Sequence, residues 1–151
     1  MFAARNARPR LVAGVDGSSP SIEALRWAVE EARLSAGTVD AIIAWKPAIP
    51  TGAGDVGLSA APGLEDIDYA ELAAKTLNAA IAEVSLPPGV PVNQLVIEGN
   101  AGEVLLGAAQ NADLLVLGHS GHGGIASALM GSVSIRCLHH ACCPVVVVRG
   151  T

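Results

Sequence analysis

Short apolar runs alternate along this chain with longer amphipathic stretches. The runs are rich in Val, Leu and Ile and bounded by Gly, Pro or Asp, which predicts buried strands at 11–15, 39–45, 92–98, 114–117 and 145–148. Between them, apolar side chains recur at three- and four-residue intervals, which predicts helices at about 19–35, 69–84, 101–110 and from 132 until Cys143-Pro144. Strands that alternate with helices in this way predict right-handed crossovers, and therefore a doubly wound, five-stranded parallel sheet.

Local sequence signals mark where these helices begin and end. Ser19 followed by Pro20 is a good pair for a helix N-cap and first turn, and Gly37 ends that helix. Asn100 with Glu103 resembles a capping box at the start of the third helix. These signals support the strand and helix boundaries predicted from periodicity.

Length and composition favour a single α/β domain. The chain has 151 residues, of which 51% are hydrophobic but only 3% aromatic, so the core must consist of Ala, Val, Leu and Ile. We expect one domain over 1–151, with its core at about 11–149. Residues 46–63 contain many glycines and prolines and predict a long loop. That loop is either a lid over a site or a surface insertion.

The charge distribution bears on partners and location. The net charge of −5 argues against nucleic acid or an anionic membrane surface as a partner. Although 114–135 contains no Asp, Glu, Lys or Arg, its glycines, serines and histidines indicate strand, loop and helix rather than a membrane span. The first ten residues lack the apolar region of a signal peptide, and three cysteines near the end do not form a secreted framework, so we expect a cytoplasmic protein.

A glycine motif follows the fourth predicted strand. Gly118, Gly121, Gly131 and Ser132 form the spacing G-x2-G-x9-G-S, in which two glycine turns flank about one short helix. Backbone N–H groups crowd together where side chains are absent, and a helix start adds unpaired donors, so the motif predicts a phosphate site. It is neither a P-loop nor a dinucleotide fingerprint. The alternative is a merely flexible loop.

These features together resemble the universal stress protein family. The G-x2-G-x9-G-S spacing, the sequence G-V-D-G-S at Gly14–Ser18 and the sequence C-P-V-V-V-V at Cys143–Val148 occur in the order typical of that family, from about Leu11 to Arg149. The full spacing resembles its ATP-binding branch. The resemblance implies a Rossmann-like, adenine nucleotide α-hydrolase-like sheet of order 3-2-1-4-5. In that order Asp16 and Gly118 meet at the crevice between strands one and four.

The resemblance also implies a set of nucleotide-binding residues. Asp16 would contact the nucleoside or help hold a metal on the phosphates, although it could instead cap the loop before Ser19. Ala44 would leave room for adenine, and the three motif glycines would let the backbone approach the phosphates, so that Gly118→Val should obstruct the phosphate path. The expected site comprises Gly14, Val15, Asp16, Ala44, Leu117, Gly118, His119, Ser120, Gly121, Gly131, Ser132, Val133 and Ser134.

The same segment argues against an enzyme. His119 and His122 flank the glycines, but no nucleophile elbow or lysine accompanies them, so we assign no catalytic residue and expect at most a slow intrinsic ATPase. Family members often carry arginine where this chain has Ser120. Phosphate binding would therefore depend on backbone donors and a bound Mg²⁺.

The expected function is ATP binding, with Mg²⁺, by a dimeric stress-response sensor or regulator. Alternatives are a nucleotide-free interaction module of the same fold and an enzyme that uses adenine nucleotides. The resemblance implies a homodimer through Val145–Val148, an apolar edge strand that the C-terminal residues or the long loop could otherwise cover. The nearby Cys137, Cys142 and Cys143 lack zinc-site spacing, so we predict no metal site there and expect Cys137 and Cys143 to pack as small apolar residues.

Overall fold

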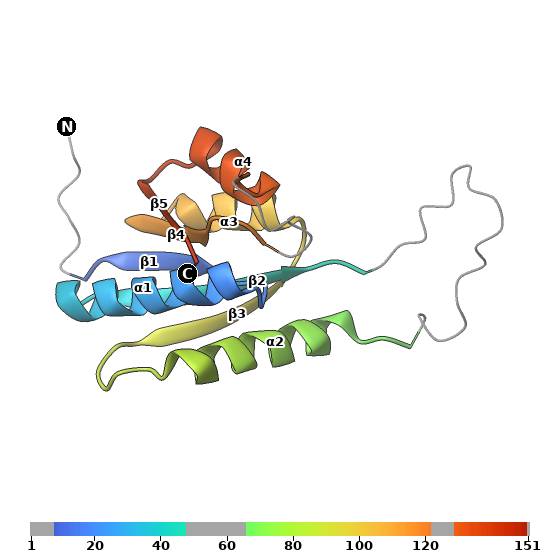
Figure 1. Cartoon of the computed structure of the whole chain (residues 1–151), viewed down its shortest axis with the longest axis horizontal. Coiled ribbons are helices and arrows are strands. Elements are labelled where there is room, and N and C mark those ends of the chain that lie inside the picture. The colour runs from blue at the N-terminus through green and yellow to red at the C-terminus, as the bar shows by residue number, and fades with distance from the viewer. Residues whose placement is uncertain (1–7, 48–65, 122–128, 151) are drawn as a thin grey trace.

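All the predicted strands and helices are present in the computed structural model, which describes residues 8–47, 66–121 and 129–150 (Figure 1). Most of the loop expected at 46–63 lies outside these residues. In chain order the elements are β1 (Arg10–Gly14), α1 (Ser19–Ser35), β2 (Thr38–Trp45), α2 (Tyr69–Val84), β3 (Val92–Glu98), α3 (Ala101–Ala109), β4 (Leu114–Gly118), α4 (Ser132–His140) and β5 (Val145–Val148).

The five strands form one parallel sheet of order β3-β2-β1-β4-β5, which confirms the predicted fold. Leu11 in β1 aligns with Val39 in β2 on one side and with Leu114 in β4 on the other. Strands β2 and β3 therefore extend the sheet on one side of β1, and β4 and β5 extend it on the other side. The change of direction lies between β1 and β4, where such a sheet opens a crevice at the carboxyl ends of its strands.

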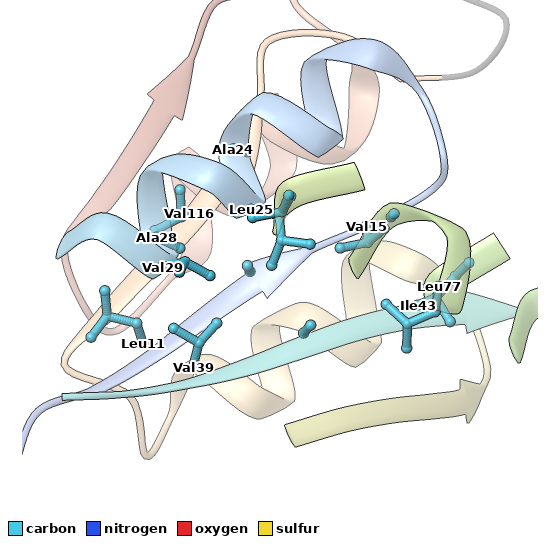
Figure 2. Packing of buried hydrophobic residues seen from close by; sticks show 14 of the residues in the cluster. Leu11, Val15, Ala24, Leu25, Ala28, Val29, Val39, Ile43, Leu77 and Val116 are labelled. Carbon is cyan, nitrogen blue, oxygen red and sulfur yellow. The ribbon is translucent and has the colours of Figure 1, made fainter. Parts of the chain in front are cut away.

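Two helices cover each face of the sheet (Figure 1). On the α1 and α2 face, Leu11 and Ala13 pack with Leu25 of α1 and Leu77 of α2 (Figure 2). Side chains alternate along a strand, so Val12 points to the α3 and α4 face instead. There it belongs to the buried cluster Val12, Ile42, Leu105, Ala109, Leu115, Leu117 and Cys137, with Cys143 packed against it. Both cysteines pack as predicted.

The helix caps agree with the sequence except at α1. The N-cap of α1 is Ser18, whose hydroxyl accepts a hydrogen bond from the Ser21 N–H at 3.4 Å. Ser19 is already the first helical residue, so the predicted cap was one residue too late. Asn100 caps α3 as expected, because its side chain accepts a hydrogen bond from the Glu103 N–H at 3.3 Å.

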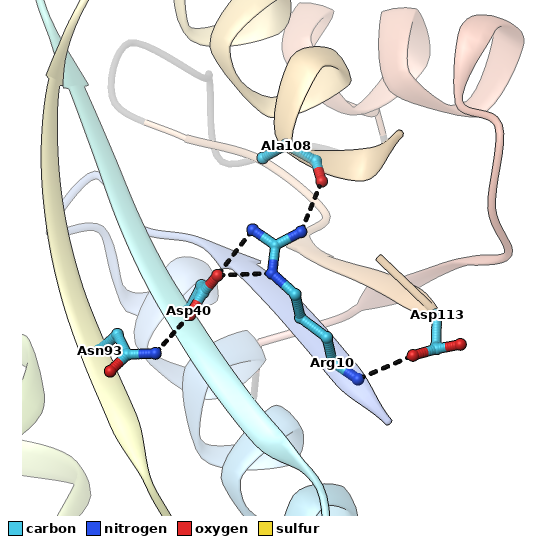
Figure 3. A network of polar contacts seen from close by, with 5 residues as sticks. All are labelled: Arg10, Asp40, Asn93, Ala108 and Asp113. Carbon is cyan, nitrogen blue, oxygen red and sulfur yellow. Dashed lines mark hydrogen bonds and ion pairs between the residues drawn. The ribbon is translucent and has the colours of Figure 1, made fainter. Parts of the chain in front are cut away.

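A polar network fastens the amino ends of the strands together (Figure 3). Arg10 in β1 donates from Nε to Asp40 Oδ2 in β2 at 2.7 Å and from Nη1 to the Ala108 carbonyl of α3 at 3.0 Å. Asn93 of β3 donates to the other oxygen of Asp40 at 2.8 Å, and the Arg10 N–H donates to Asp113. The network therefore joins three strands, α3 and the residue before β4. Sequence patterns gave no sign of it.

Candidate functional site

A cavity of about 460 Å³ opens at the carboxyl ends of β1 and β4, on the α3 and α4 face of the sheet. All the predicted site residues except His119 line it. The crossover geometry thus brings together segments that lie about a hundred residues apart in the chain. The full lining is Gly14, Val15, Asp16, Ser21, Ile42, Ala44, Ala101, Leu105, Leu117, Gly118, Ser120, Gly121, Leu129, Met130, Gly131, Ser132, Val133 and Ser134.

Asp16 organises the turn between β1 and α1. Its Oδ1 accepts hydrogen bonds from the Ser18 N–H at 2.9 Å and the Ser18 hydroxyl at 2.5 Å, and its own N–H donates to Ser21 Oγ at 3.2 Å. This is the turn-capping role that the sequence left open, and the same residue also lines the cavity. Gly121 lies close to the carboxylate, because a Cβ at that position would collide with Asp16 Oδ2.

Gly118 is required by packing rather than by the cavity. A Cβ on Gly118 would lie 2.7 Å from the Pro20 carbonyl carbon and 2.8 Å from the Ser21 nitrogen, both in the first turn of α1. A side chain on Gly118 would therefore point at α1, which corrects the expectation that Gly118→Val would obstruct a phosphate path. A valine there would instead push α1 away from β4.

The N-terminus of α4 provides backbone donors to the cavity. Its N-cap is Gly131, which has no side chain to cap the helix, and the first helical hydrogen bond runs from the Ile135 N–H to the Gly131 carbonyl at 3.0 Å. The N–H groups of 132–134 therefore have no acceptor within the helix. Together with the positive end of the helix dipole, they favour an anion at this end of the cavity.

The hydroxyl groups of the lining differ in their availability. Ser134 Oγ donates to the Gly118 carbonyl at 2.7 Å and Ser21 Oγ donates to the Ser18 carbonyl at 2.9 Å, so neither proton is available to a ligand. The backbone N–H of Ser134 is still able to donate to a ligand. Ser132 is solvent-exposed at the start of α4, and its hydroxyl can turn toward a ligand.

His119 acts through its main chain and does not line the cavity. Its N–H donates to the Val148 carbonyl of β5 at 2.8 Å, and its carbonyl accepts a hydrogen bond from the Gly131 N–H at 2.9 Å. These two bonds connect the end of β5 with the start of α4. The other histidine of the motif, His122, lies outside the described residues.

Sequence reasoning missed the apolar wall of the cavity. Ile42 and Leu105 lie within the predicted strand 39–45 and helix 101–110 and were not among the expected site residues, yet both line the cavity where the core reaches its edge. A signal was present in the alternation of β2, because Ile42 shares its face with Ala44, which was predicted. Leu129 and Met130, which precede Gly131, and Ala101 at the start of α3 were also missed.

Cys137, Cys142 and Cys143 are not among the described residues that line this cavity. Cys137 is buried in α4, and burial raises the pKa of its thiol. Burial also raises the pKa of Cys143. Within the described residues no three His, Cys, Asp or Glu side chains are placed to hold a metal ion.

Comparison with known proteins identifies the family. The profile described as the universal stress protein family matches residues 8–149, which is nearly the whole chain. The chain belongs to the universal stress protein family. In the parts of this universal stress protein that the structure describes, no helix combines the length and apolarity needed to cross a membrane.

This universal stress protein resembles the universal stress protein Rv2624c of Mycobacterium tuberculosis, with 30% identity over 139 residues. The match covers 92% of this chain but 47% of that protein, so the chain spans about half the length of this relative. A universal stress protein solved in complex with cAMP has 22% identity and a TM-score of 0.65, covering 97% of this chain and 100% of that one. An Arabidopsis thaliana family member solved with AMP bound has 18% identity and a TM-score of 0.59, covering 95% and 92%.

Proposed function

We propose that this universal stress protein binds ATP, with Mg²⁺ on the phosphates, in the cavity between β1 and β4. The observation that carries the proposal is the convergence of three features on one cavity, namely the uncapped start of α4, the turn from Gly118 to Gly121, and Asp16. Its volume of about 460 Å³ lies within the range of small-molecule sites.

The lining has two chemically different ends. Ile42, Ala44 and Leu105 form a wall of aliphatic side chains, against which a flat base would pack. Ser120, Gly121 and the first turn of α4 supply main-chain donors and suit the phosphates. The AMP and cAMP complexes of proteins with this fold support an adenine nucleotide as the ligand class.

The oxygen atoms of the site suit Mg²⁺. This cation prefers carboxylate and phosphate oxygens and keeps several waters, and Asp16 is the carboxylate of the lining. When bound, Mg²⁺ would neutralise phosphate charge. Asp16 would hold it near the phosphates or contact the ribose, and it keeps the turn before α1 in place in either case.

We propose a binding protein rather than an enzyme. The lining residues that the structure describes include no lysine, arginine or cysteine, and the imidazole of His119 is not among them. Charge stabilisation is the main contribution of enzymes to phosphoryl transfer, so hydrolysis without such groups is slow. The protein would act as a dimeric sensor or regulator of the stress response in the cytoplasm.

The proposed dimer forms through β5. Val145–Val148 pairs with β4 along one edge, and each of these valines is partly exposed. Pairing with a second copy across a twofold axis would satisfy the outer edge and cover its valines. A nucleotide-free interaction module would use the same surface, so occupation of the cavity is what separates the two functions.

A melting experiment with a cavity-filling variant tests nucleotide binding. ATP with Mg²⁺ at about a hundred times its Kd should stabilise the protein by about 2.7 kcal/mol and raise its Tm. Ala44→Phe should abolish the rise in Tm because the ring would occupy the space beside the aliphatic wall. Ala82→Phe, on the exposed side of α2, should retain the rise. A Tm that does not respond to millimolar ATP would contradict the proposal and favour the interaction module.

A further inference from the structure

The cavity contains few charged groups. Among the described residues that line it, Asp16 is the single ionisable one, and none is a lysine or arginine. The sequence from Leu114 to Ile135 contains no lysine or arginine at all, so residues 122–128, which the structure does not describe, cannot supply one either. Any ligand phosphate must therefore be bound without a cationic side chain from this segment.

The nearest arginine on α4 is engaged outside the cavity. Arg136 follows Ser132 by about one helical turn and forms an ion pair with Glu103 of α3 at 3.6 Å. Its stem packs over Gly102, where a Cβ would lie 2.9 Å from Arg136 Cδ. The pair is neutral as a whole, so it provides no net positive charge for a phosphate. Arg10 is at the far end of the sheet with Asp40.

The donors that remain are suited to a small anionic charge. The N-terminus of α4 contributes the equivalent of about half a positive charge, together with the N–H groups of its first turn. Main-chain donors of this kind, together with the dipole, can bind a single phosphate group, which carries one or two negative charges. ATP without a metal carries about four negative charges, and closely spaced like charges repel strongly in a partly enclosed site.

We propose that this cavity selects nucleotides by the total charge of their phosphates. It binds a nucleotide with one or two negative charges directly, and it binds ATP tightly only when a divalent cation arrives with the phosphates. This inference depends on the proposed function, because it concerns the same cavity. It adds a rule for which nucleotide binds and under which conditions.

Ser120 is the position that sets this limit. It lines the cavity, and its Cα lies 3.4 Å from the position that a Cβ on Gly131 would occupy, so its side chain begins beside the N-cap of α4. A long cationic side chain at this position could reach the phosphates. With serine there, the positive charge has to come with the ligand.

Calorimetric titration with cAMP, AMP and ATP, each in EDTA and in Mg²⁺, tests the charge rule. The wild-type protein should bind cAMP equally under both conditions and bind ATP at least about tenfold more tightly with Mg²⁺. Ser120→Arg should raise the affinity for metal-free ATP by about tenfold and remove most of the Mg²⁺ effect. Asn78→Arg adds the same charge on the exposed side of α2 and should behave as the wild type.

Each other outcome would overturn a specific statement. Equal binding of ATP in EDTA and Mg²⁺ by the wild type would refute the charge rule and leave the proposed function intact. A Mg²⁺ effect that persists in Ser120→Arg would refute the role of Ser120, because the metal would then act as a specific ligand rather than as a neutraliser. Failure of all three nucleotides to bind either the wild type or Ser120→Arg, with both folded, would refute the proposed function and the charge rule together.

Discussion

Replacing Gly118 by alanine should test whether this glycine serves packing or ligand binding. The added Cβ would lie 2.7 Å from the backbone carbon of Pro20, whereas a comfortable carbon contact is about 3.5 Å. Either β4 or the first turn of α1 must then shift by about 0.8 Å. Neither segment yields easily, since β4 is a central strand and both neighbouring atoms belong to the backbone.

The cost of this shift can be estimated by comparison with Gly131. Overpacking of a well-packed contact costs up to about 3 kcal/mol, and alanine recovers about 0.7 kcal/mol by restricting the unfolded chain, which leaves a net loss of about 2 kcal/mol for Gly118→Ala. At Gly131 the nearest atom would be 3.4 Å away, an ordinary contact. At Gly131 the stabilisation from restricting the unfolded chain roughly offsets the loss from alanine being a poorer N-cap than glycine. Gly131→Ala should therefore leave the free energy of unfolding nearly unchanged.

Urea unfolding without nucleotide measures both changes. With a slope of about 2 kcal/mol/M for a domain of this size, Gly118→Ala should lower the midpoint by about 1 M and Gly131→Ala by less than about 0.3 M. The slopes should remain equal. If Gly118→Ala unfolds at the wild-type midpoint, or if both variants lose the same stability, the packing role assigned to Gly118 is wrong.

Two further predictions concern the start of α1 and the cysteines. Ser18→Ala should lower the free energy of unfolding by about 1 kcal/mol because it removes the N-cap, whereas Ser19→Ala should leave the urea midpoint nearly unchanged, and the reverse ranking would restore Ser19 as the cap. Alkylation of the native protein near neutral pH, followed by peptide mass spectrometry, should modify the exposed Cys142 first. Cys137 should react only on unfolding, because burial shields it and raises its pKa, which lowers its thiolate fraction at a given pH; early labelling of Cys137 would contradict its burial.

The fold was predictable because its signals are local and repeated. Val145–Val148 and Val92–Glu98 are the strands predicted from their apolar runs, and the Asn100 cap was found from the spacing of two residues. The strand order came from the resemblance to a family, and the sheet confirms it. Periodicity alone indicates which face of a strand is buried but not which strands are neighbours.

The sequence predicted which residues line most of the cavity, but it did not predict which way their atoms point. The glycine spacing and Asp16 identified most of the lining, because residues at the carboxyl ends of β1 and β4 must meet in this topology. The sequence could not show that a Cβ on Gly118 would point at Pro20, since that depends on how closely α1 approaches β4. Likewise, the partner of the Ser134 hydroxyl is a carbonyl sixteen residues away.

The bonds around Arg10 and Asp40 have a practical meaning for redesign. They hold the strands in alignment at the end of the sheet farthest from the cavity, through contacts that no ligand would touch. Segments at the cavity end can therefore be exchanged, lengthened or recharged while strand alignment is kept by groups elsewhere. A designer who wishes to alter what this protein recognises should change the segments that line the cavity and keep Arg10 and Asp40.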